Sequence, residues 1–333
     1  MYNVSATKFN PQIKPMHHKK ILLVSYSQTG QLTKLVNNFI FPLQKESFIE
    51  VFHKTIKPVK AYPYPWDLMS FMDAFPESIN LSGCEIEEFT GDENDYDLII
   101  LAYQVWFLSP SIPTAAFLKS DYATEKFKNK PVITLIGCRN MWVMAQEKVK
   151  NLLENLGANL IDNVVLIDQG NSLGTFITTP RWLLTGKKDS ILGLSPAGIS
   201  ENEIKKSDRF GRALISALKN DEEKKNQPLL KGLVAVSVNV KLIKSEKIAT
   251  KSFTIWGKLI RKLGKPESSK RKPALMLYLV FLLLMILTIV PINMVVQSIL
   301  KIFNKKSIEE QKTKYELPSG SSKQRMKEFS ENV

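Results

Sequence analysis

The sequence predicts a doubly wound α/β protein: a five-stranded parallel sheet with helices on both faces, plus a C-terminal transmembrane or re-entrant helix. Four short apolar runs have the composition of parallel strands that are buried on both faces. They lie at 21–26, 98–103, 132–137 and 164–168. Helical patterning separates or follows these runs at 32–41, 111–119, 141–156 and 201–219. Alternating strands and helices of this kind predict one sheet between two helical layers.

A fifth strand is expected at 48–55, directly after the first helix. Together these elements predict one folded domain over 19–220, preceded by a disordered N-terminus at 1–18. Two stretches inside the domain exceed ordinary loop length. The stretch 57–94 is rich in aromatic residues and Met, and 169–200 contains a short predicted helix at 178–184. Their apolar content favours lids or binding elements.

The net charge of +14 is concentrated near the C-terminus. Of 46 Lys and Arg and 32 Asp and Glu, residues 241–273 hold eleven basic against two acidic, and 301–333 hold eight against five. The remaining 1–240 hold 27 basic and 25 acidic residues, so a basic groove for nucleic acid is not expected. Two cysteines and three histidines, without ligand spacing, give no reason to expect a metal site.

The segment 274–300 contains no charged residue and is long enough to cross a membrane. Pro291 leaves two topologies open, a full span or a re-entrant anchor. The preceding 221–273 is predicted to be a basic amphipathic juxtamembrane region that lies on anionic lipid. Because positive charge beside a crossing stays on the cytoplasmic side, we expect a cytoplasmic domain. A full span would place the tail, 301–333, outside. This tail is polar and is expected to be disordered.

The turn after the first strand has the composition of a phosphate-binding loop. Ser27, Gln28, Thr29, Gly30 and Gln31 stand between the strand and a helix. The first turn of a helix leaves backbone N–H groups without partners, and Gly30 allows a close approach or a positive φ. The alternative is an ordinary strand-to-helix turn that Ser27 or Thr29 caps.

Two further loops are expected at neighbouring strand ends, where ligands of open α/β sheets bind. One is Gln104-Val105-Trp106-Phe107, and the other begins at Gly137 and continues as Cys138-Arg139-Asn140-Met141-Trp142. Both combine aromatic faces with polar groups. A phosphate cradle beside two aromatic loops fits a flat, phosphorylated cofactor.

These residues resemble the flavodoxin-like proteins, which carry an S-x-T-G-x-[ST] loop after the first strand. In that family the loop binds the phosphate of FMN, so the resemblance implies FMN as cofactor. The match is Ser27-Gln28-Thr29-Gly30-Gln31. The chain departs from the pattern at Leu32, where the last hydroxyl usually stands, and at Gln104, where Pro is frequent.

A narrower resemblance covers about 19–300. It rests on YDLIILAYQVWFLSPSIP, KPVITLIGCRNMW followed by AQEKVK, TTPRWLLTGKK, and RKP before the apolar segment. Together these look like the flavodoxin-like proteins identified as dialkylresorcinol condensing enzymes, which accompany a ketosynthase in flexirubin-type pigment biosynthesis. This resemblance implies a ketosynthase partner and a long-chain apolar or aromatic substrate.

The resemblance also implies roles for single residues. Ser27, Thr29, Gly30 and Gln31 would hold phosphate, and Trp106 with Trp142 would flank the isoalloxazine ring. Trp106 has a core residue as its alternative. Arg139 could stabilise negative charge on a reduced flavin or an enolate, or form a surface ion pair. The remaining cofactor-binding candidates in these loops are Gln28, Gln104, Val105, Phe107, Gly137 and Asn140.

Cys138 is the candidate nucleophile for a condensing reaction, although a small buried thiol is the usual state of such a residue. Asp168, at the end of the fourth apolar run, could act as a base or cap a turn. Three functions therefore remain open. They are a membrane-tethered flavoprotein of aromatic polyketide biosynthesis, an FMN-dependent NAD(P)H:quinone-type oxidoreductase, and a non-catalytic scaffold for a ketosynthase at the membrane.

Overall fold

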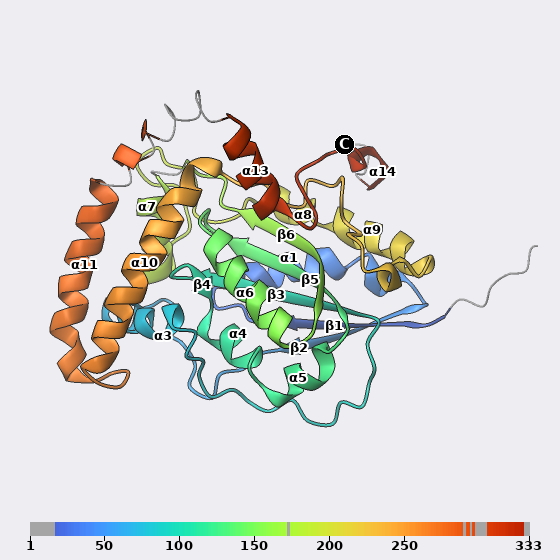
Figure 1. The fold of residues 1–333 in the computed structure, drawn as a ribbon, viewed down its shortest axis with the longest axis horizontal. Helices are drawn as coiled ribbons and strands as arrows, with labels where there is room; N and C mark the ends of the chain where they lie inside the picture. Colours follow the sequence, from blue (N-terminus) through green and yellow to red (C-terminus); the bar gives the residue numbers. More distant parts are fainter. Residues whose placement is uncertain (1–16, 172–173, 289–290, 294, 297–304, 330–333) are drawn as a thin grey trace, which may run out of the picture.

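The computed structural model describes residues 17–171, 174–288, 291–293, 295–296 and 305–329, and nearly all of the expected N-terminal disorder lies outside them. Five parallel strands form the sheet in the order β2-β1-β3-β5-β6 (Figure 1). Their bounds are β1 Lys19–Ser25, β2 Ile49–Thr55, β3 Leu98–Trp106, β5 Pro131–Cys138 and β6 Asn159–Ile167. This order, with its switch point between β1 and β3, is the flavodoxin-like one.

All five expected strands are present, and several are longer than their apolar runs. The side chains of Ile21–Val24 and Leu98–Tyr103 are fully buried, as expected for strands that helices cover on both faces. The sequence analysis did not predict β4 (Ser109–Pro110), which pairs antiparallel with the end of β3. It also missed α5 (Asp121–Phe127), which Ser120 caps.

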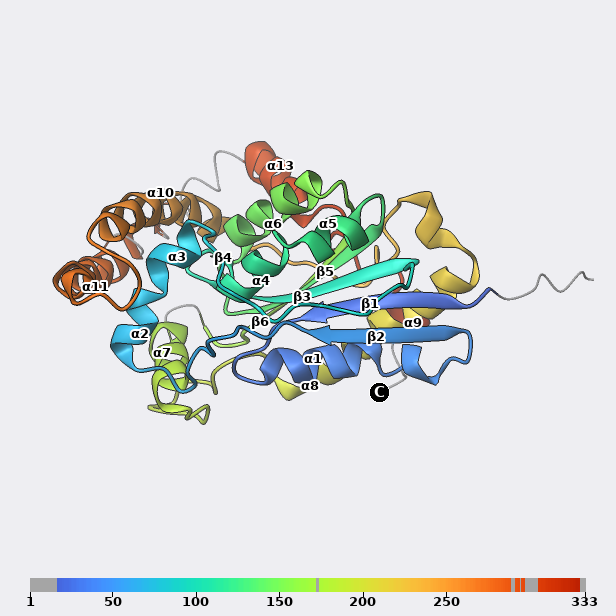
Figure 2. The same ribbon diagram turned by 90° about the horizontal axis from the view of Figure 1, so that it is seen from below.

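Helices cover both faces of the sheet (Figure 2). One face carries α1 (Gln31–Ile40), α8 (Glu201–Lys205) and α9 (Asp208–Lys219). The other carries α4 (Ile112–Phe117), α5 and α6 (Val143–Asn155). Short 3₁₀ helices are η1 (Leu43–Lys45), η2 (Glu222–Lys225) and η3 (Ser269–Arg271). The predicted helix 201–219 is thus two helices, with a break before Asp208.

The carboxyl ends of the strands point toward a helical cover (Figures 1 and 2). Its members are α2 (Leu68–Asp73), α3 (Phe75–Ile79), α7 (Thr175–Thr185), α10 (Val240–Lys262) and α11 (Lys272–Leu287). The helices α10 and α11 form a hairpin that packs on the 57–94 insertion through its own apolar cluster. In that cluster the rings of Phe75 and Tyr278 stack with centroids 4.2 Å apart.

Close packing holds α10 against α3. Gly257 is buried in the middle of α10, and a Cβ there would lie 2.6 Å from a methyl group of Ile79. Glycine weakens a helix interior, so its presence here is explained by the short distance between the two helices.

The region before and after the hairpin is more ordered than the sequence indicates. The predicted juxtamembrane region 221–273 begins with a stretch, Leu229–Val238, that belongs to the core of the domain: its apolar side chains at 229, 230, 233, 235, 236 and 238 are buried. The polar tail forms α13 (Lys305–Glu316) and α14 (Met326–Phe329). The expectation of a disordered tail is therefore wrong for 305–329.

Candidate cofactor site

The loop between β1 and α1 presents backbone N–H groups at the switch point of the sheet. Gly30 has a φ of 77° and is the N-cap of α1. Within the described chain, no group accepts a hydrogen bond from the backbone N–H of Gln28, Thr29, Gly30 or Leu32. Four such donors at a helix N-terminus are suited to an anion.

The side chains of this loop divide into two groups. The hydroxyls of Ser27 and Thr29 lie in the loop and accept hydrogen bonds from the N–H groups of Thr33 (3.3 Å) and Gln31 (3.4 Å). The Gln31 amide instead pairs with the backbone of Ile199, accepting at 3.2 Å and donating at 3.3 Å. Gln31 therefore joins α1 to the loop before α8, and its side chain is not available to an anion.

Gln28 is held by the aromatic insertion, because its Nε2 donates to the carbonyl of Pro63 at 2.7 Å. Its Oε1 is buried and has no partner. A buried acceptor without a partner costs stability, which marks this position as one where a donor group can bind.

Leu32 is a core residue. Its side chain is 3% exposed and packs in the main apolar cluster, near Gly137. The missing hydroxyl at this position therefore leaves the backbone donors of the loop in place.

The loop after β3 supplies the aromatic wall. Trp106 packs edge-on against Tyr26, Tyr62 and Trp66, with centroids 5.1 to 5.9 Å apart. Gln104 donates to the carbonyl of Tyr26 at 3.3 Å. The cavity beside the phosphate-type loop is lined by Gln104, Val105, Trp106 and Phe107, so the structure brings these four predicted residues together.

Phe107 and Leu108 form a strained turn between β3 and β4. Both have positive φ, 47° and 57°, in a two-residue hairpin loop. Such a turn normally takes Asn or Gly, and bulky residues there cost of order 1–3 kcal/mol each. The sequence gives no turn signal here, which is why β4 was not predicted. The turn places Phe107 in the wall of the candidate cofactor cavity and also in the wall of a second, neighbouring cavity that is described below. The ring of Phe107 contacts the rings of Phe71 and Phe75.

In the loop after β5, some residues line a cavity and others belong to the core. Gly137, Cys138 and Arg139 line the candidate cavity, whereas Asn140 lines its neighbour. Trp142 is 2% exposed and packs in the main core. The expectation that Trp142 flanks the cofactor therefore does not agree with its position, because its ring faces the interior below α6.

Arg139 stands between the two cavities. Its Nε donates to Thr175 Oγ1 at 2.8 Å, and its guanidinium lies over the ring of Phe176 at 3.7 Å. Burial lowers the pKa of Arg139 to about 10, and the carboxylate of Asp168 opposes this shift. Arg139 thus remains a cation at neutral pH, in a largely buried position rather than at the surface.

Asp168 organises the long 169–200 loop. Its two carboxylate oxygens accept hydrogen bonds from the N–H groups of Gly170 (2.7 Å) and Gly198 (2.6 Å). Both oxygens are used to shape the cavity wall, so of the two expected roles the turn cap agrees with the structure. From this loop and α7, Thr179, Trp182, Leu183 and Gly198 also line the cavity, and the sequence analysis did not single them out as site residues.

Cys138 is poorly placed to act as a nucleophile. Burial, with the carboxylates of Glu246 and Asp168, raises the pKa of the thiol well above its ordinary value. His53 lies on β2, which β1 and β3 separate from β5, and its Nε2 is 2.8 Å from the Ser25 hydroxyl. No histidine in the described chain is therefore available to deprotonate Cys138.

Two cavities meet at this edge of the sheet. The candidate cofactor cavity has a volume of about 160 Å³. The second, which we call the apolar chamber, measures about 260 Å³ and lies between the β3–β4 turn, Phe176 and the α10–α11 hairpin. Val105, Phe107, Cys138 and Arg139 line both, so the two cavities share a wall.

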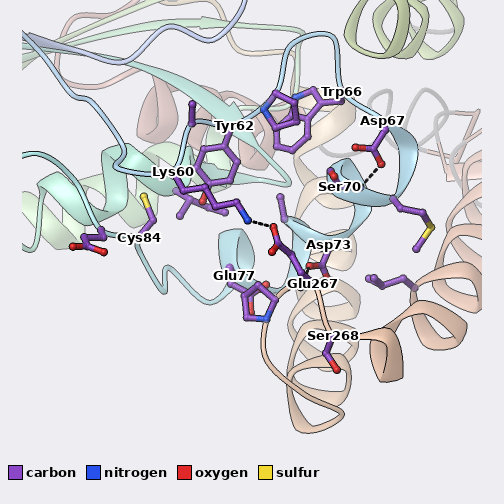
Figure 3. Close-up of a pocket in the computed structure, with 18 of the residues that line it drawn as sticks. Lys60, Tyr62, Trp66, Asp67, Ser70, Asp73, Glu77, Cys84, Glu267 and Ser268 are labelled. Carbon is purple, nitrogen blue, oxygen red and sulfur yellow. Dashed lines mark hydrogen bonds and ion pairs between the residues drawn. The ribbon is translucent and has the colours of Figure 1, made fainter.

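A larger cleft, about 710 Å³, lies elsewhere, between the aromatic insertion and the turn from α10 to α11 (Figure 3). Ion pairs lie in it and beside it: Lys60 with Glu267, and the fully buried Arg271 with Glu77 (2.9 Å) and Asp73 (3.3 Å). These pairs tie the hairpin to the insertion. The described residues contain no cluster of His, Cys, Asp and Glu suited to a metal.

The fold is flavodoxin-like. Comparison with models of known protein families finds no match, and comparison with curated proteins finds none either. Solved structures with a similar arrangement include a flavoprotein in complex with FMN from Lactobacillus acidophilus, with 20% identity and a TM-score of 0.36 over 44% of this chain and 93% of that one. Another is oxidised flavodoxin 1 from Bacillus cereus, with 14% identity and a TM-score of 0.32 over 60% and 98%. A third is the Trp repressor binding protein of Bacillus subtilis, with 14% identity and a TM-score of 0.27 over 45% and 86%.

Proposed function

We propose that this protein binds FMN and acts as a membrane-associated flavoprotein in the biosynthesis of dialkylresorcinol or flexirubin-type aromatic polyketides. The observation that carries FMN binding is the β1–α1 loop, with four unpartnered N–H groups and two hydroxyls at the switch point of a flavodoxin-like sheet. One of the similar solved structures, the flavoprotein from Lactobacillus acidophilus, is a complex with FMN.

In this proposal Ser27, Thr29 and the backbone N–H groups of 28–30 and 32 hold the phosphate. Trp106 and Phe107 supply apolar walls for the ring system. At about 160 Å³ the cavity is smaller than the roughly 300 Å³ at which typical ligand pockets begin, so binding requires the wall to move. The 169–200 loop is the expected moving part, since Trp182 and Leu183 face the cavity from it.

When bound, FMN supplies electron or hydride transfer. The residues of the chain orient the group, exclude water and place the Arg139 cation where an anionic oxygen can lie. The substrate is proposed to be an apolar long-chain or aromatic compound, and a ketosynthase is the proposed partner. The sequence resemblance supports both, and the apolar chamber beside the site supports the choice of substrate.

A visible absorption spectrum of the detergent-solubilised protein, followed by titration with FMN, tests the cofactor. We expect the spectrum of oxidised flavin, or its appearance on titration. The double variant Ser27→Ala/Thr29→Ala should bind FMN at least about tenfold more weakly, because two hydroxyl donors are lost. The control is Thr33→Ala, which removes an exposed hydroxyl one turn further along. A colourless protein that takes up no FMN would refute the cofactor.

The reaction class needs a second measurement. Steady-state oxidation of NAD(P)H in the presence of a quinone would assign the flavin-bound protein to quinone reduction instead. For the biosynthetic role, we expect loss of pigment product when Ser27→Ala/Thr29→Ala replaces the wild type at normal protein level. Unchanged product would instead favour a scaffold that needs no cofactor.

A further inference from the structure

The apolar chamber has the position of a substrate site. It lies directly beside the candidate cofactor cavity, with Val105, Phe107 and Arg139 in the common wall. Its other walls are apolar residues of α10 and α11, chiefly Ala249, Phe253, Leu282 and Met285.

The chamber also reaches the surface of the hairpin. Ile248, on its rim, is 41% exposed. The outer face of α11 beside it is apolar and exposed, with Leu277, Leu284 and Leu287 between 58% and 73% accessible. The chamber therefore opens beside exposed apolar residues of the hairpin, from which a hydrophobic molecule can enter.

The inner end of the chamber carries a positive charge. Arg139, in the wall that the chamber shares with the cofactor cavity, is cationic. An apolar tunnel that ends on a cation is complementary to an amphiphile with an acidic head group. The positive charge at the inner end distinguishes the chamber from a purely apolar gap that any lipid tail could occupy.

We propose that the apolar chamber binds a single aliphatic chain whose terminal oxygen, a carboxylate or phenolate, lies at Arg139. The chain enters from the α11 side, and its head group lies next to the cofactor cavity. This inference rests on the proposed function and supplies its substrate class.

Photo-crosslinking with a fatty acid that carries a diazirine on its chain tests the proposal on the full-length protein in lipid nanodiscs. Peptide mapping should place the label on the inner wall, at Met141 or Phe176, as well as on 281–286. Excess lauric acid should remove it. The corresponding fatty alcohol should label at least about tenfold less, because it lacks the charge that pairs with Arg139.

The variant Ala249→Phe fills the chamber from α10 and should reduce inner-wall labelling at least about tenfold. Lys244→Phe adds the same ring on an exposed position of α10 and should leave the labelling unchanged. FMN content is measured on each sample, so a failure of the chamber is distinguished from a failure of cofactor binding. Label confined to the outer face of α11, or equal labelling by the alcohol, would overturn the proposal.

A second inference comes from the tail, which docks on the domain after the apolar segment. Ser319 is fully buried; its hydroxyl donates to Asp162 at 2.6 Å and accepts from the N–H of Asn163 at 2.7 Å. The N–H of Val234 donates to the carbonyl of Ser322, and Arg325 Nη1 donates to the carbonyl of Leu229 at 2.9 Å.

Along the chain, the apolar segment therefore lies between the domain and a tail that packs on the same domain. Ser269–Asn293 is long and apolar enough to cross a membrane, with a mean hydropathy of 2.9 and only 12% of its most apolar stretch buried. Along α11 one face packs on the domain, from Leu275 and Tyr278 to Leu282 and Met285, while the opposite face is exposed.

We infer that the segment does not cross the bilayer: α11 lies in the interface plane with its exposed face in the lipid, and the tail stays on the side of the domain. A crossing would separate Ser319 from Asp162 and leave Oδ1 of this buried side chain without its hydrogen-bond donor, while Oδ2 would keep its bonds from Leu229 and Leu230. Of the two topologies that the sequence left open, the structure favours an anchor that returns to its own side.

Labelling with a membrane-impermeant maleimide tests the topology in a background without native cysteines (Cys84→Ser/Cys138→Ala). Lys327→Cys reports on the tail, and Lys57→Cys reports on an exposed position of the domain. We expect both to react from the same side, in comparisons of intact bacterial cells with inverted membrane vesicles. Reaction of the two from opposite sides would overturn the inference.

Discussion

Two tryptophans that follow neighbouring strands have very different surroundings. Trp106 lines the candidate cofactor cavity and packs edge-on against Tyr62 and Trp66. Trp142 is 2% exposed and belongs to the main core. The sequence places both at strand ends, but only the path of the loop decides which ring reaches the cavity.

We predict that Trp106→Phe and Trp142→Phe separate binding from stability. Trp106→Phe should weaken FMN binding severalfold with little change in the melting temperature, because it alters the cavity wall. Trp142→Phe should lower the free energy of unfolding by about 1–3 kcal/mol through lost core volume, and leave FMN affinity unchanged. FMN titration and thermal unfolding of both variants check this. A larger loss of affinity in Trp142→Phe would place that ring at the site after all.

Residue patterns located the phosphate-type loop but not the shape around it. Ser27, Thr29 and Gly30 were identifiable because the loop chemistry depends on residues that are adjacent in sequence. The role of Gln31 was not, since it is set by the backbone of Ile199, which lies far away along the chain. For Asp168 the local turn cap at Gly170 was expected, but its second bond, to Gly198, was not. The strained turn at Phe107 carries no sequence signal at all.

At the scale of elements, one buried carboxylate joins α10 to the start of α6. Glu246 on α10 is 1% exposed, and its Oε2 accepts a hydrogen bond from the N–H of Met144 at 3.0 Å. The N-terminus of a helix favours negative charge, yet burial dominates and raises the pKa of Glu246 to about 8. This contact sets the position of α10 and therefore that of the apolar chamber.

The raised pKa predicts a pH-dependent stability. In the unfolded chain a glutamate titrates near about 4.3, so between about pH 4 and pH 8 unfolding releases a proton that the folded state retains. Stability contributed by Glu246 is therefore full at low pH and falls as pH rises toward 8. Asp162, whose pKa burial raises to about 7, acts in the same direction.

We predict that Glu246→Gln flattens this dependence. The melting temperature of the wild type should fall from pH 5 to pH 8 more steeply than that of the variant, with Asp162 accounting for the part that remains. Glu154→Gln, on the exposed side of α6, is the control with the same change in charge. Parallel pH profiles for wild type and Glu246→Gln would contradict the assignment.

Elements with a clear apolar pattern in the sequence were predictable, and elements that depend on tertiary contacts were not. The apolar strands 21–26 and 98–103 appear with only their ends changed. By contrast, the sequence of Leu229–Val238 resembles an apolar lead-in to a membrane segment. In the structure it is core, because it packs beside β6 with the N–H of Val165 bonded to the carbonyl of Ala235.

At the scale of the whole molecule, apolar and basic groups gather on one end. The α10–α11 hairpin lies at the end of the domain to which the strand carboxyl ends point (Figure 1). It exposes Ile255 and Leu259 on α10 together with the outer leucines of α11. Lys258, Lys262 and Lys265 are exposed next to them. This combination is typical of helices that lie at the surface of anionic membranes.

We predict that binding to lipid vesicles depends on charge and persists in salt. Vesicles with anionic lipid should bind the protein more tightly than neutral ones, and 1 M salt should weaken the difference because the Debye length falls to about 3 Å. Some binding should remain, since the outer face of α11 is apolar. Lys258→Gln/Lys262→Gln should lose most of the salt dependence, and Lys57→Gln should not. Equal binding to both lipids in a co-sedimentation assay would contradict this.

The docked tail also has a consequence for how the chain is made. Asp162 and β6 are translated well before the residues that complete their surroundings, Leu229 and Ser319. The apolar segment lies between Leu229 and Ser319 in the sequence, so it is synthesised before the domain can complete its fold. In the topology that we infer, the C-terminus stays on the side of the domain, so the domain can complete its fold only when the apolar segment has returned to that side.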